Sequence, residues 1–325
     1  MRDLTERIDP HFFLRPLPPA APRRLAVITC YFNPCGYRSL RENYLRFIND
    51  LRFFRLSLFV AEVAYNGERF VDDSAFLCLR AGPEHIMWQK ERLLNLLVER
   101  LPEEFDAVAW IDADALLLDS AWPQKALRAL EHYPAVQLFE KWHFTDMNGR
   151  IDRTKAGVGH LGQWMLKHGR GAAAPGGAWA AHREIFPLYD AHILGGGDSA
   201  LLETWLAMDG SFVAGTMSRS YQRHYARWQR QTRQKIRGKV SCLPGEVAHL
   251  YHGSHLNRRY TERHQILSRH GFNPLRHIRI DEQGLHAWTD EAPAALQTEV
   301  SEYFLARHED HGLLAEFGER LNGSR

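Results

Sequence analysis

Short apolar segments alternate with amphipathic helical patterns through the first half of the chain, and this alternation restricts the fold more than any other feature. Residues 25–31 form an apolar run, residues 39–51 carry apolar side chains at helical spacing, and a second apolar run covers residues 55–62. Parallel strands need a crossover between them, and a helix is the usual one. We therefore predict an α/β fold with a mostly parallel central sheet flanked by helices.

The same alternation continues along the chain. Further strands are expected at residues 76–79, 107–111 and 135–139. Further helices are expected at residues 86–101, 122–132, 182–190, 198–208, 218–236, 257–269, 294–307 and 311–321. The glycine-rich stretch 147–174 is expected to be irregular. Clustered prolines predict an extended arm over residues 1–23, followed by a main domain at 24–285 and a small helical C-terminal cap at 286–325.

Composition excludes several classes of protein. The 325 residues are 45% hydrophobic and 25% charged, as in an ordinary globular protein, and the formal charge is only +2. No global field therefore marks a nucleic-acid or membrane binder, and any such preference must be local. Four cysteines without a CxxC pair, no signal-peptide pattern and no long apolar run lead us to expect a cytoplasmic protein of bacteria or of phage-infected cells.

One glycine motif does not fit its expected context. Residues 157–162 match the G-x-G-x-x-G pattern of dinucleotide-binding proteins. A charged loop precedes them instead of the strand that such a site requires. We interpret the match as accidental.

Asp112 and Asp114 follow directly after the apolar strand 107–111. Ligands bind at the carboxyl ends of strands in open α/β sheets, and two like charges are costly there unless a cation compensates them. Carboxylates at positions i and i+2 suit Mn²⁺ or Mg²⁺ bound to a diphosphate. The alternative is a turn in which both aspartates cap the next element.

With this motif, the sequence resembles the GT-A glycosyltransferases, which use nucleotide-diphosphate sugars and a D-x-D metal site. The resemblance extends over residues 25–267 but rests on short stretches. It implies that the end of the first strand holds the nucleotide base, that Glu62 contacts the base or ribose, and that the helix at Lys90 lines the donor pocket. Asp112 and Asp114 would then bind the metal, and Asp112 also the donor. The base-binding residues would be Thr29, Tyr31 and Asn33.

A second stretch, residues 175–186 followed by 195–202, is similar to galactosyltransferase-like GT-A enzymes. There a glycine pair, here Gly176 and Gly177, lets the backbone approach the donor sugar, and an acidic residue meets the acceptor. Asp198 follows three glycines and is expected at a helix N-cap, where backbone donors keep it ionised. It is our candidate catalytic base, and a purely capping role is the alternative. Ser199 stands where the family has a second acidic residue.

A histidine-rich stretch supplies the remaining candidates. In related enzymes a histidine before a glycine completes the metal shell, and His252 before Gly253 matches this best, with His249 and His255 as alternatives. The resemblance assigns the diphosphate to Arg258 and Arg259, whose guanidinium groups suit phosphate oxygens. A structural role for any of these histidines and a three-histidine zinc site remain open alternatives.

The acceptor is indicated by a basic helix. Residues 211–240 contain no aspartate or glutamate, and the arginines fall on one helical stripe with Trp228 interleaved. Such a surface suits a phosphate backbone and an exposed base, or alternatively acidic glycans, lipid head groups or solvent alone. The stripe residues are Arg219, Arg223, Arg227, Arg230 and Arg233.

Residues 252–264 also look like phage-type glycosyltransferases that modify hydroxymethylated pyrimidines in DNA. We therefore expect a metal-dependent, inverting hexosyltransferase that moves a sugar from a UDP-sugar to such a base in double-stranded DNA. Transfer to a surface polysaccharide, a lipid-linked glycan or a protein is the first alternative. A non-catalytic nucleotide or nucleic-acid binding module is the second.

Overall fold

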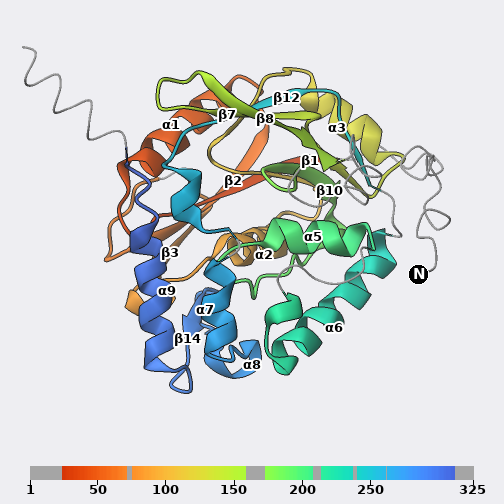
Figure 1. Cartoon of the computed structure of the whole chain (residues 1–325). Coiled ribbons are helices and arrows are strands. Elements are labelled where there is room, and N and C mark those ends of the chain that lie inside the picture. Colours follow the sequence, from red (N-terminus) through yellow and green to blue (C-terminus); the bar gives the residue numbers. More distant parts are fainter. Residues whose placement is uncertain are drawn as a thin grey trace, which may run out of the picture.

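The centre of the molecule is a seven-stranded sheet (Figure 1). The computed structural model describes residues 24–71, 75–158, 173–207, 214–236, 240–260 and 262–311. All neighbouring strands are parallel except β10, which runs antiparallel to both β4 and β6. This confirms the predicted α/β class with a mostly parallel sheet. In spatial order the strands are β11 (Val240–Cys242), β6 (Ala135–Gln137), β10 (Ala178–His182), β4 (Ala107–Ile111), β1 (Leu25–Phe32), β2 (Ser57–Tyr65) and β3 (Leu77–Ala81).

Helices cover both faces of this sheet because its strands are apolar on both sides. In β1, Ala26 and Ile28 belong to one core cluster and Leu25 and Val27 to the other. The first cluster includes side chains of α2 (Lys90–Arg100), α5 (Gly197–Trp205) and α6 (Arg219–Ile236). The second includes side chains of α1 (Arg38–Arg52) and α3 (Trp122–Leu130). This two-sided burial is typical of parallel sheets.

A second, five-stranded sheet lies beside the first. It contains β5 (Ala115–Leu117), β12 (Glu246–His249), β7 (Lys141–Thr145), β8 (Ile151–Gly157) and β9 (Ala173–Ala174) in spatial order. The sequence did not predict it, and the expectation of an irregular stretch at 147–174 is wrong for β8. The β7–β8 hairpin forms because Asp146 accepts from Asn148 and Arg150 in the turn, where Gly149 has a φ of 76°.

The helix expected at residues 182–190 is absent. Only a single turn, η5 (Arg183–Ile185), follows β10. Pro187 lacks a donor for a helix, and the backbone of Leu188 bonds instead to the side chain of Asn95, at 2.7 and 2.9 Å. The helix expected at 257–269 is also divided, into η7 (His255–Arg258) and α7 (Arg263–Arg269).

The C-terminal hairpin, which precedes the last described helix, contacts the start of α2. Strands β13 (Ile278–Ile280) and β14 (His286–Trp288) form a hairpin across the predicted boundary at residue 286. Gln89 and Arg92 bond to the carbonyls of His286 and Gly284, at 2.7 and 2.9 Å. The remaining elements are η3 (Pro83–His85), η6 (Ala214–Thr216), α8 (Pro274–His277) and α9 (Ala294–Ala306).

Some predictions fall outside the described residues. These are the arm at 1–23, all but the first residue of the helix predicted at 311–321, and most of the 157–162 glycine motif. Within the described ranges, no helix has both the length and the apolar character needed to cross a membrane. All four cysteines are free.

Candidate active site

Asp112 and Asp114 lie where the sequence placed them, at the carboxyl end of the central strand β4. The Asp112 N–H donates to the Gly177 carbonyl at 2.7 Å, and the Ala115 N–H closes a turn onto the Asp112 carbonyl at 3.0 Å. This turn leads from the large sheet into β5 of the small one. The two carboxylates therefore stand between the sheets, but they contact different partners.

Asp112 pairs with a buried lysine. The Nζ of Lys90, the first residue of α2, lies 2.7 Å from Asp112 Oδ1 and 3.3 Å from Asp198 Oδ2. Burial lowers the pKa of Lys90, but the carboxylates of Asp112 and Asp198 outweigh burial and hold it well above its usual value. Lys90 therefore remains a cation between two acidic side chains.

Asp198 approaches this group from α5. The N-cap of α5 is Gly196, at a φ of 103°, and Asp198 is in the first turn, so the expectation that Asp198 is the cap is wrong. The carboxylate lies against Gly176, where a Cβ would be 2.2 Å from Asp198 Oδ2. Lys90 thus links Asp112 in the D-x-D turn to Asp198 in the first turn of α5. Asp198 is the residue that the sequence indicated as the catalytic base.

Asp114 pairs with two histidines. Its Oδ2 lies 2.8 Å from His252 Nε2 and 3.5 Å from His249 Nε2. Strand β12 runs antiparallel to β5 and places His249 opposite Ala115, and the Leu250 N–H donates to the Asp114 carbonyl at 2.8 Å. Burial raises the pKa of Asp114, but His249 and His252 outweigh it and hold the pKa well below its usual value.

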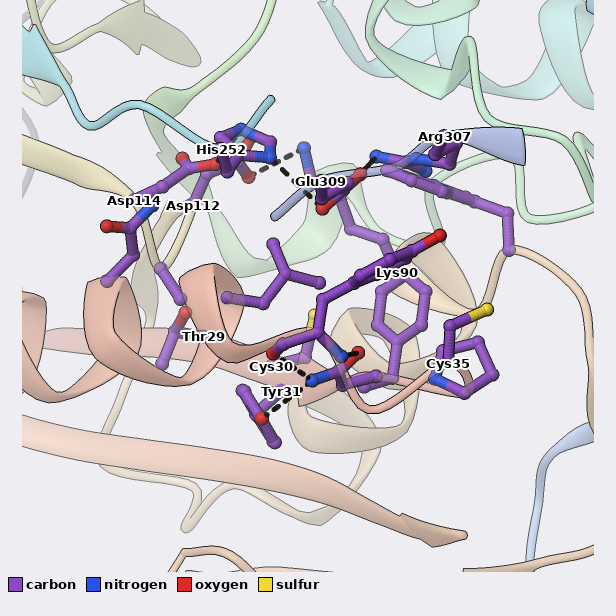
Figure 2. A pocket seen from close by; sticks show the side chains of 18 of the residues that line it. Thr29, Cys30, Tyr31, Cys35, Lys90, Asp112, Asp114, His252, Arg307 and Glu309 are labelled. Carbon is purple, nitrogen blue, oxygen red and sulfur yellow. Dashed lines mark hydrogen bonds and ion pairs between the residues drawn. The ribbon is translucent and has the colours of Figure 1, made fainter. Parts of the chain in front are cut away.

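The second nitrogen of His252 faces a further cluster. Its Nδ1 lies 3.2 Å from Glu309 Oε2 and 2.6 Å from Arg258 Nη2, which also contacts Nε2 of the same ring. Glu309 also pairs with Arg307. Figure 2 shows Asp114, His252, Glu309 and Arg307 along one wall of the pocket. Two cationic guanidinium groups and a buried carboxylate therefore surround the histidines.

The Asp114, His249 and His252 group fits a divalent metal ion. One potential ligand atom from each residue lies within 4.8 Å of the others. The Oδ1 of Asp114 is buried and has no hydrogen-bond partner among the residues that the structure describes, which leaves a carboxylate oxygen for a ligand. A carboxylate with two imidazoles is a donor set that Mn²⁺ accepts. Asp112, also expected in the metal shell, is paired with Lys90 in this structure, and His249 is the third residue of the group.

The cavity beside these residues has two compartments. One, shown in Figure 2, is lined mainly by apolar side chains, which include Tyr31 and Phe32 at the end of β1, Pro34 after it, Leu40 of α1 and Phe304 of α9. The other is wider and polar. Both are lined by Asp112, Asp114 and His252, so the metal-binding group stands where they join.

The polar compartment has a cationic and aromatic wall. Arg153 and Lys155 of β8 line it, and the Arg153 guanidinium lies 4.4 Å from the centre of the Phe144 ring. Burial and the repulsion of Arg153 lower the pKa of Lys155. Among the described residues no carboxylate pairs with either cation. The other wall residues with basic or aromatic side chains are Trp88, Lys90, Trp142, His249, His252, His255, Arg258, Tyr260, Arg263 and Arg307.

Some of the residues predicted to bind the donor line the cavity, and others lie outside it. Thr29, Tyr31 and Asn33 line the apolar compartment, although the Asn33 amide is also bonded to Tyr37. Gly176 and Gly177 line the polar one, where the Trp142 ring fills the space beside Gly177.

Glu62 and Arg259 lie away from both compartments, whereas Arg258 lines the polar one. Glu62 is within β2 rather than at its end, and its buried carboxylate accepts from the backbone of Phe70 and from Val71 at 3.0 Å. It therefore fixes a loop. Arg259 is exposed and lines a separate hollow beside Glu262.

The basic helix α6 presents its arginines to solvent but not its tryptophan. Arg219, Arg223, Arg227, Arg230 and Arg233 are exposed, as the stripe predicted. Trp228 is buried against Tyr189 and Tyr225 and donates to the Pro187 carbonyl at 2.8 Å. It cannot stack on a nucleic-acid base, so this part of the prediction is wrong. No described residue of α6 lines either compartment.

Sequence reasoning missed several lining residues. Arg307 and Glu309 follow α9 and come to the site only through tertiary packing. Arg153 and Lys155 lie on a strand that was not predicted. The one available signal was the three-residue spacing of His249 and His252, which allowed both to be considered as ligands.

No protein-family model matches the chain, and no curated protein matches it. Similar solved structures include a suggested nucleotide-diphospho-sugar transferase of Desulfovibrio desulfuricans G20, with 12% identity over 70% of this chain and 82% of that one, at a TM-score of 0.32. Another is a mutant Drosophila β1,4-galactosyltransferase 7 in complex with manganese, UDP-Gal and xylobiose, with 12% identity over 67% and 64% of the chains and a TM-score of 0.33.

A third is the 4-diphosphocytidyl-2C-methyl-D-erythritol synthase of Anaerococcus prevotii, with 11% identity over 69% and 88% of the chains and a TM-score of 0.32. Nucleotide-sugar transferases are thus among the structures that this chain resembles. At TM-scores below 0.5, these likenesses do not assign it an activity.

Proposed function

We propose that the protein is a metal-dependent glycosyltransferase that uses a nucleotide-diphosphate sugar, with a UDP-sugar as the expected donor. The observation that carries this proposal is the Asp114, His249 and His252 group at the junction of an apolar and a cationic compartment. A nucleotide sugar has the matching parts in the same order: an aromatic base, a diphosphate and a polar sugar.

The donor would lie across the junction. The base would occupy the apolar compartment beside Tyr31, at the end of β1. Asp114, His249 and His252 would hold Mn²⁺ or Mg²⁺, which when bound neutralises charge on the leaving diphosphate. Arg258 and Arg307, whose guanidinium groups border the same site, would bind the phosphate oxygens.

Asp198 is the proposed catalytic base. It lines the polar compartment, where the acceptor would enter, and Lys90 holds its carboxylate in place. The acceptor oxygen would attack the anomeric carbon as the bond to the diphosphate oxygen breaks, and its proton would pass to Asp198. Direct attack inverts the configuration at that carbon. General-base assistance of this kind contributes about 10²–10⁴ in rate.

A hydroxymethylated pyrimidine in DNA is the proposed acceptor. The polar compartment carries Arg153 and Lys155, which pair with no carboxylate of the described ranges, next to aromatic side chains, and α6 offers an exposed row of arginines for a phosphate backbone. The base must be reached in the major groove or flipped out of the duplex. A glycan acceptor is the second candidate, because Trp142, Phe144 and Tyr260 also provide faces on which a sugar ring packs.

The test is a panel of nucleotide sugars with Mn²⁺, with release of nucleoside diphosphate measured in the presence of hydroxymethylated DNA, unmodified DNA or no acceptor. We expect release to be stimulated by hydroxymethylated DNA and not by unmodified DNA. Release that no DNA stimulates would contradict the DNA acceptor and leave the glycan candidate. No release from any donor would contradict the proposed function.

A further inference from the structure

The end of α9 and the residues that follow it, residues 304–311, are fixed against the active site, and we call this segment the C-terminal strap. The Asp310 carboxylate accepts from the backbone of Arg38 at 3.0 Å and of Ser39 at 2.8 Å, at the start of α1. The Tyr251 hydroxyl donates to the His311 carbonyl at 3.0 Å. Phe304, Arg307 and Glu309 of the strap line the apolar compartment.

Gly253 allows the strap to approach the histidines. Its φ is 86°, and a Cβ at this position would lie 2.8 Å from the Cα of Glu309. A larger residue would push the strap away from His252. Gly253, the glycine after His252, therefore has a packing role.

Glu309 is the residue that this packing brings to the metal-binding group. Its side chain is 1% exposed, and its Oε2 lies 3.2 Å from His252 Nδ1. The ion pair with Arg307 compensates its buried charge. On the other side of the ring, His252 Nε2 faces Asp114. The imidazole is thus held between Glu309 and Asp114.

We propose that Glu309 is a positioning residue that fixes the tautomer of His252 for metal binding. This inference rests on the metal site of the proposed function. A metal-binding histidine commonly donates its other N–H to a carboxylate, which orients the ring and makes the ligand nitrogen more basic. With a proton on Nδ1 shared with Glu309, the Nε2 lone pair faces Asp114 and His249.

The two carboxylates beside the ring favour different tautomers. Glu309 accepts a proton carried by Nδ1, whereas Asp114 Oδ2 lies 2.8 Å from Nε2 and accepts a proton carried there. The Arg258 Nη2 contacts both ring nitrogens and so does not select between them. Without Glu309, the proton of the neutral ring would lie on Nε2 beside Asp114, where it blocks the metal.

The test is titration of the full chain with Mn²⁺ alone, following free Mn²⁺ by electron paramagnetic resonance. We expect Glu309→Ala to raise the dissociation constant about 10- to 100-fold. Glu309→Gln should raise it less, because its amide oxygen still accepts from Nδ1. The matched control is Asp310→Ala, which loosens the strap at α1 but does not contact His252, and it should affect affinity less than Glu309→Ala.

Two outcomes would overturn the inference alone: wild-type affinity in Glu309→Ala, or equal loss in Glu309→Ala and Asp310→Ala. If the wild type binds no Mn²⁺, the proposed function fails with it. Thermal unfolding of the metal-free variants reports whether each variant folds. If Glu309→Ala does not fold, the dissociation constant of Glu309→Gln for Mn²⁺ tests the inference instead. Long-range ¹H–¹⁵N spectra of His252 give a second readout, with the proton on Nδ1 in the wild type and lost from it in Glu309→Ala.

Discussion

At the scale of single residues, the two aspartates of the D-x-D motif have different partners and therefore different proposed roles. Asp112 is neutralised by the buried cation Lys90, whereas Asp114 pairs with two imidazoles and has one oxygen without a partner in the described part of the chain. The spacing of a D-x-D motif makes the two carboxylates look equivalent, but the turn between β4 and β5 directs them to different neighbours. Only Asp114 lies where a metal ion would be shared with histidines.

Asp114→Asn should abolish metal-dependent turnover. An amide keeps the shape of the side chain but is a poorer metal ligand, and loss of several kcal/mol of charge stabilisation corresponds to about a 10³-fold fall in kcat or more. Nucleoside diphosphate release at saturating Mn²⁺ is the measurement. Asp152→Asn, at an exposed position of β8, is the control and should behave as wild type.

Asp198→Asn should separate chemistry from donor binding. Because the amide cannot accept the acceptor proton, we expect transfer to fall about 10²- to 10⁴-fold. Affinity for the nucleoside diphosphate with Mn²⁺ should change little, since Asp198 is not among the expected metal ligands. Comparing kcat with calorimetric binding checks this, and unchanged transfer would remove Asp198 as the base.

The lowered pKa of Asp190 makes the free energy of unfolding depend on pH in the acid range. Burial raises its pKa, but His286, Arg92 and Asn95 outweigh burial and lower it to about 2. Because the folded-state pKa lies below the unfolded value, the carboxylate stabilises the protein above about pH 4, and this contribution disappears as the pH falls to about 2. Wild type should exceed Asp190→Asn in free energy of unfolding by about 2–3 kcal/mol at pH 6, and the difference should vanish near pH 2. A constant difference would contradict the assignment.

At the scale of elements, α6 divides into a core face and a solvent face. Tyr221, Tyr225 and Trp228 are buried on one side and the arginines are exposed on the other. The sequence stripe predicted the arginine face correctly because helical spacing is local. It could not show that Trp228 belongs to the core, since this depends on Tyr189 and Pro187 from another segment.

Trp228→Ala should therefore act on stability. Removing a buried tryptophan leaves a cavity and should cost about 3–5 kcal/mol in free energy of unfolding, measured by urea denaturation. Trp228→Phe should cost less and leave any DNA affinity unchanged. Weaker DNA binding by a stably folded Trp228→Phe would show that the indole contacts the acceptor after all.

The exposed face of α6 predicts salt-dependent binding. If it contacts phosphates, replacing Arg219, Arg223 and Arg227 by glutamine should reduce the slope of log affinity against log salt by about 0.9 per lost contact. Release of nucleoside diphosphate without acceptor should not change. The matched control is Arg46→Gln with Arg52→Gln on α1. Equal slopes in wild type and the α6 variant would exclude this face from DNA binding.

At the scale of the whole molecule, two sheets and the C-terminal strap meet at one site. The α/β class and the position of Asp112 and Asp114 could be predicted because strand ends and apolar runs are local signals. The pairing of Asp114 with His249 depends on β12 joining β5, 130 or so residues later in the chain. The contact of Glu309 with His252 depends on the packing of Gly253 against the strap. Such contacts leave no periodic pattern in the sequence.

The central claim is that a divalent metal ion binds between the two sheets and holds a nucleotide sugar there. Anomalous diffraction from crystals soaked with Mn²⁺ and UDP tests it most directly. The account predicts a manganese peak within bonding distance of Asp114, His249 and His252, with the uracil near Tyr31. A site without manganese, with His252 still bonded to Asp114, would contradict it.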